Sequence, residues 1–135
     1  MPIHINWYNE EQTILLIELD GKWELTDFIN MYDVSRAMTK GTTHDYVIMV
    51  SFLKSASMPA KLLSVGDKFR EPDGTNLPLM TIMIGMGRIY EIMLNLIIRI
   101  YPTAVKDARL VDTWEEGLAL AASTLAQAKS LKENN

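Results

Sequence analysis

Cysteine is absent from the 135 residues, and histidine occurs only at His4 and His44. The chain therefore has no thiol nucleophile, disulfide or thiolate metal ligand, and two separated histidines make neither a zinc centre nor a Ser-His pair. The adjacent carboxylates Glu10–Glu11 and Glu115–Glu116 fit turn and helix-capping roles, since adjacent residues do not face each other. The sequence predicts a protein that is not an enzyme and that uses no metal or cofactor.

Positive charge and long apolar runs are also scarce. Thirteen Lys and Arg against seventeen Asp and Glu give a net charge of −4, which argues against a nucleic-acid partner. No basic stretch followed by an apolar run opens the chain, so no secretion signal is predicted. The most apolar region, residues 77–101, is interrupted by proline, glycine and charged residues, and falls short of the roughly 20 apolar residues of a transmembrane helix. We expect a cytoplasmic protein with no transmembrane segment.

The length and composition fit one globular domain. Apolar residues make up 48% and charged residues 22%, close to the average of globular domains. No segment between residues 1 and 131 has the composition of a linker, and residues 132–135 form a polar tail. We expect a single domain over residues 1–131.

The hydrophobic pattern predicts an α/β fold. Alternation at Ile3, Ile5 and Trp7 is typical of a half-buried strand, and the apolar run 13–19 indicates a second strand that forms a hairpin with it. Further strands are predicted at 46–52, 79–84 and 108–111. Helices are predicted at 26–38, from Ser57 to 70, at 88–100, and at 113–129, where Thr113 and Glu116 form a capping box. The order is strand, strand, then three helix–strand pairs and a final helix.

This order predicts a five-stranded mixed sheet with helices packed on it. Right-handed crossovers make the last four strands parallel, and the hairpin adds the first strand antiparallel at an edge.

The segment 88–101 is unusually apolar for a surface helix. Its polar residues fall within about 80° of a helical projection, which leaves about 280° apolar, whereas a surface helix usually buries a stripe little wider than about 100°. Three explanations remain open: cover by neighbouring helices, a homodimer seam, or contact with a lipid or a membrane surface. The predicted partner or dimer surface comprises Met86, Ile89, Tyr90, Met93, Leu94 and Ile97.

Several residues follow the carboxyl ends of the predicted strands, where open α/β sheets most often bind ligands. The ligand-rim candidates are Trp23, Ser55, Ser57, Arg88 and Trp114. Core packing of both tryptophans and a helix-cap role for Ser57 are the alternatives. The Gly85–Met86–Gly87 segment lacks the third glycine of a dinucleotide-binding fingerprint, so a tight turn is favoured there over a phosphate site.

Three segments carry a resemblance to a known family. They are the apolar run 14–19 ahead of Gly21, the run 46–52, and the sequence LVDTWEEGLA at 110–119. Over about residues 3–129 the pattern resembles the SpoIIAA-like group of the STAS (sulphate transporter and anti-sigma-factor antagonist) superfamily. The resemblance implies a SpoIIAA/STAS-like fold and a regulatory or protein-interaction module without catalytic activity. It also implies lipid-like ligands for some members.

The family's Asp-Ser-Ser/Thr-Gly phosphorylation motif is missing. Aligned without gaps, the motif falls on Ser57–Met58–Pro59–Ala60, which places Met58 at the phosphorylated position. We therefore expect a non-catalytic interaction module, a homodimer, without this phosphorylation switch. The alternative is a module that binds or senses a lipid-like or other apolar small molecule, with peripheral membrane contact.

Overall fold

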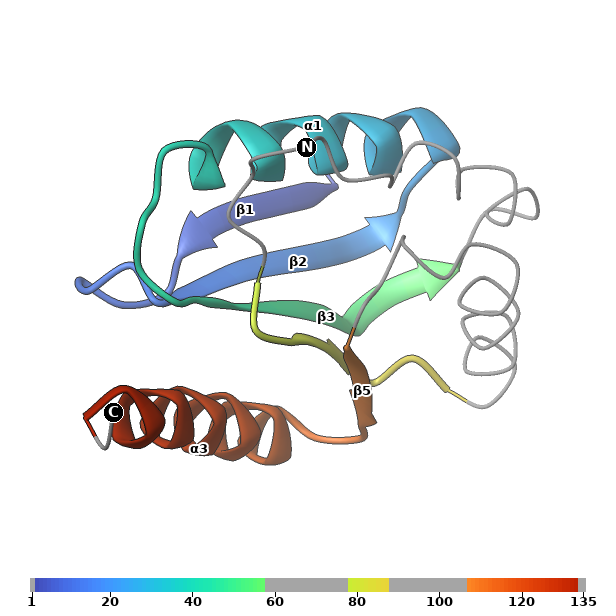
Figure 1. The fold of residues 1–135 in the computed structure, drawn as a ribbon. Helices are drawn as coiled ribbons and strands as arrows, with labels where there is room; N and C mark the ends of the chain where they lie inside the picture. The colour runs from blue at the N-terminus through green and yellow to red at the C-terminus, as the bar shows by residue number, and fades with distance from the viewer. Residues whose placement is uncertain (1, 58–77, 88–106, 134–135) are drawn as a thin grey trace.

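The computed structural model describes residues 2–57, 78–87 and 107–133, and the structural statements below concern these residues. They form five strands and two helices (Figure 1). The elements are β1 (Ile3–Trp7), β2 (Ile14–Lys22), α1 (Leu25–Thr39), β3 (Val47–Ser57), β4 (Thr81–Ile84), β5 (Ala108–Val111) and α3 (Trp114–Glu133). The helix predicted at 88–100 lies outside the described residues.

The five strands form one sheet in the order β1-β2-β3-β4-β5. Strand β1 pairs antiparallel with β2, while β2, β3, β4 and β5 pair parallel in succession. The predicted mixed sheet with an antiparallel edge strand is therefore confirmed. In Figure 1 the sheet lies between α1, which runs beside β1, and α3.

Two strands extend further than the sequence pattern predicts. Strand β2 continues to Lys22, because Asp20, Gly21 and Lys22 still pair with β3 through two register shifts. Gly21 has a φ of +67°, a conformation that side chains with a Cβ rarely adopt. Strand β3 continues to Ser57, five residues beyond the predicted strand end at 52, and the helix predicted to follow it lies outside the described residues.

The first helix begins slightly earlier than predicted. Its N-cap residue is Glu24, two positions before the predicted start at residue 26. The backbone N–H of Glu24 donates to the Asp27 carboxylate at 2.9 Å. Asp27 thus satisfies a backbone donor from inside the first turn, where its negative charge also suits the positive end of the helix dipole.

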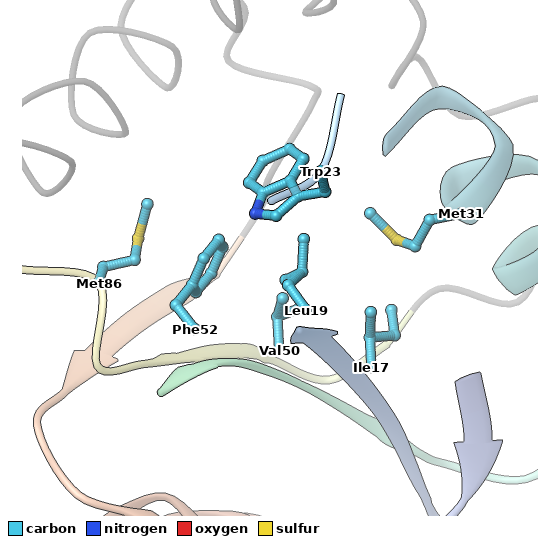
Figure 2. Packing of buried hydrophobic residues seen from close by; sticks show 7 residues of the cluster. All are labelled: Ile17, Leu19, Trp23, Met31, Val50, Phe52 and Met86. Atoms are coloured by element: carbon cyan, nitrogen blue, oxygen red, sulfur yellow. The ribbon is translucent and has the colours of Figure 1, made fainter. Parts of the chain in front are cut away.

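Side chains alternate between two apolar clusters, one on each face of the sheet. The cluster on the α1 side, drawn in Figure 2, comprises Ile17, Leu19, Trp23, Met31, Val50, Phe52 and Met86. The cluster on the α3 side comprises Ile14, Val47, Met49, Met80, Ile82, Ile84 and Ala121. Strands β2 and β3 supply both clusters, as expected of strands that are covered on both faces.

Gly117 sets how closely α3 approaches the sheet. A Cβ at this position would lie 2.7 Å from Ile84 Cδ1 and 3.0 Å from Ile84 Cγ1. Ile84 is completely buried, so its side chain has little room to move away. Glycine is therefore the residue that permits this close packing between helix and sheet.

Gly117→Ala is expected to lower the free energy of unfolding by about 1–3 kcal/mol, the usual cost of overpacking. In an exposed helix, replacing glycine by alanine would raise the free energy of unfolding by about 1 kcal/mol. The sign of the measured change therefore distinguishes overpacking from helix propensity. Urea denaturation followed by circular dichroism measures the change. Ala119→Gly, at an exposed position of α3, is the matched control for helix propensity. A stabilised Gly117→Ala variant would contradict the close packing.

The start of α3 confirms part of the predicted capping box. The backbone N–H of Glu116 donates to Thr113 Oγ1 at 3.1 Å, as the capping-box pattern predicts. The Glu116 carboxylate accepts a hydrogen bond from the Thr113 hydroxyl at 3.0 Å. Thr113 thus satisfies one of the free backbone donors in the first turn of the helix.

Candidate functional site at the carboxyl edge of the sheet

Three adjacent parallel strands bring candidate residues to one edge of the sheet. The pairing of β3 with β4 ends where Ser51 lies opposite Ile84, and β3 then continues beside β2. Trp23 directly follows β2, Ser55 lies near the end of β3, and Met86 follows β4. The edge predicted to bind a ligand is therefore where these three residues lie.

Trp23 is held in the core at this edge. Its side chain is 2% exposed, and its indole Nε1–H donates to Ser55 Oγ at 2.8 Å. The ring stacks on Phe28 with a centroid distance of 5.5 Å and lies 6.5 Å from the Phe52 ring. Figure 2 shows Trp23 above Phe52 and Leu19. The structure thus places Trp23 among core side chains, with its polar N–H satisfied by a neighbouring strand.

Met86 belongs to the same cluster and is 8% exposed. The flanking Gly85 and Gly87 have φ values of +72° and +80°, which fits the tight turn favoured from the sequence. A Cβ at Gly85 would lie 2.6 Å from Leu53 Cδ2, so a larger residue there would displace Leu53. Met86 was predicted as part of a partner surface, but in the single chain it is a buried core residue.

Trp114 does not lie near Trp23 and Ser55, the other described residues of the predicted ligand rim. It packs against the cluster on the α3 side, opposite the face that holds Trp23. Its ring makes an edge-on contact with Tyr8, with centroids 5.6 Å apart and planes at 80°. The predicted rim is therefore divided between the two faces of the sheet. The cause is that the chain turns from β5 to the α3 side, whereas it turns from β2 to the α1 side.

The remaining candidates fall outside what the structure describes. The side chain of Ser57 lies outside the described part of the chain, although its backbone ends β3. Six predicted site residues also lie outside the described residues, namely Arg88, Ile89, Tyr90, Met93, Leu94 and Ile97. Their assignment to a partner surface or a ligand rim stays a prediction.

Sequence reasoning did not include Phe28, Met31 or Phe52 among the residues around Trp23. All three pack in or against its cluster. Phe52 ends the predicted strand 46–52, and Phe28 lies in the predicted helix 26–38. The sequence could have indicated Phe28 and Phe52 as neighbours of Trp23, because the helix that contains Phe28 and the strand that contains Phe52 both lie next to the end of β2.

The described residues offer little for metal chemistry. Residues 2–57, 78–87 and 107–133 contain no group of three or more His, Cys, Asp or Glu that could hold a metal ion. His4 is exposed, and His44 Nε2 lies 2.7 Å from the carbonyl oxygen of Gln12, a contact that links two loops.

Within residues 2–57, 78–87 and 107–133, no helix has the length and hydropathy needed to cross a membrane.

Comparison with solved structures identifies the fold. The chain is similar to an uncharacterized protein of the DUF3478 family from Shewanella loihica PV-4, whose crystal structure has a SpoIIAA-like fold. The match covers 88% of this chain and 91% of that chain, with a TM-score of 0.56 and 16% sequence identity. The chain has a SpoIIAA-like fold.

The SpoIIAA-like fold confirms the resemblance drawn from the three sequence segments. No family model matches the chain, and no curated protein matches it. At 16% identity the likeness extends to the fold alone. The function of this SpoIIAA-like chain must therefore be argued from its own residues.

Proposed function

We propose that this SpoIIAA-like chain is a non-catalytic module that acts by contact, and that residues 88–101 join two copies as a homodimer. The sequence of this segment carries the proposal. About 280° of its helical projection is apolar, which is far more than one sheet face covers. If four large side chains were left without cover, burying them would contribute on the order of 6–12 kcal/mol, at roughly 1.5–3 kcal/mol each.

The described fold places the residues that come directly before this segment. The chain leaves β4 through Gly85, Met86 and Gly87 at the carboxyl edge of the sheet. The buried Met86 side chain fixes this turn to the α1-side cluster. Gly87, the last described residue before this segment, therefore follows a buried core residue at that edge.

Ile97→Glu tests the homodimer directly. A charge in an apolar seam is costly to bury, so we expect the variant to remain folded and to elute as a monomer, while the unchanged protein has the mass of a dimer. Size-exclusion chromatography with light scattering gives the mass, and far-ultraviolet circular dichroism reports folding. Ala122→Glu, at an exposed position of α3, is the matched control and should leave the mass of the dimer unchanged.

Three outcomes would count against the seam. A monomeric unchanged protein would reject the homodimer. An unfolded Ile97→Glu variant would assign Ile97 to the core of the single chain. A folded variant that keeps the mass of a dimer would move the interface elsewhere.

A second candidate function is the binding of a lipid-like or other apolar small molecule. It is favoured by the apolar, methionine-rich middle of the sequence, which contains Met80, Met83, Met86 and Met93. Methionine side chains adapt their shape readily, and apolar sites with few polar groups suit apolar ligands. Native mass spectrometry of freshly purified protein tests this candidate. A native mass larger than that of the polypeptide, with the excess lost on denaturation, supports ligand binding. A native mass equal to that of the polypeptide alone argues against ligand binding.

A further inference from the structure

We draw no further inference here: the strongest candidate, the surface patch that Tyr8 and Trp114 form beside the start of α3, carries nothing because no described residue shows what would cover it.

Discussion

Trp23→Ala is expected to lower the free energy of unfolding by about 3–5 kcal/mol, the range for removing a large buried aromatic side chain. The indole is 2% exposed and stacks on Phe28 from α1, so its loss leaves a cavity between the helix and the sheet. Guanidinium chloride denaturation followed by far-ultraviolet circular dichroism measures the loss. A loss below about 1 kcal/mol would mean that the site collapses around alanine, and would contradict a packed core at this edge.

Two further variants separate packing from hydrogen bonding at the same place. Trp23→Phe keeps an aromatic ring but removes the Nε1–H donor, so we expect a smaller loss than for alanine. Ser55→Ala keeps the indole but removes the acceptor that lies 2.8 Å from Nε1. An unsatisfied buried donor costs about 1–3 kcal/mol, and that is the loss expected for Ser55→Ala. Equal stability of Ser55→Ala and the unchanged protein would show that another acceptor replaces Ser55.

The strands were predictable because their signal is local. The alternation at residues 3–7 predicts β1, and the predicted strand 108–111 coincides with β5 (Ala108–Val111). The alternation of β1 reflects which side chains face the core, and the continuous apolar runs of β2 and β3 reflect cover on both faces. Each of these patterns lies within the sequence of the strand itself. The parallel order followed from the handedness of crossover connections, and the observed sheet confirms it.

The end of β3 was not predictable in the same way. The apolar run that predicts this strand ends at Phe52, yet β3 continues to Ser57, which pairs with Lys22 in the sheet. That pairing joins residues 35 positions apart, and it depends on β2 continuing through Gly21. A local pattern cannot contain this information, so the boundary was placed too early.

The candidate site was partly predictable for a related reason. Parallel strands end at one edge, and this rule alone brings Trp23, Ser55 and Met86 close together. The rule does not say which face of the sheet the chain turns to after each strand. Trp114 therefore lies on the wrong side for a shared rim, and the burial of Trp23 depends on Phe28 from a different element.

Ile82→Ala is expected to lower the free energy of unfolding by about 2–5 kcal/mol. Ile82 is completely buried in the α3-side cluster, and β4 lies between β3 and β5, so the surrounding backbone has little freedom to close the cavity. Chemical denaturation measures the loss. Leu53→Ala on β3 is the control, because the Leu53 side chain is 52% exposed and its truncation should cost much less. Similar losses for both variants would contradict the burial of Ile82.

The milder variants Ile82→Val and Trp23→Phe test whether the two clusters are energetically independent. The clusters lie on opposite faces of the sheet and share no buried side chain. Mutations at distant sites without shared partners usually add to within about 0.5 kcal/mol, so the double variant should lose the sum of the two single losses. A larger deviation would mean that the strands between the clusters transmit packing changes from one face to the other. In that case a ligand or partner at the carboxyl edge would also alter the packing beneath α3.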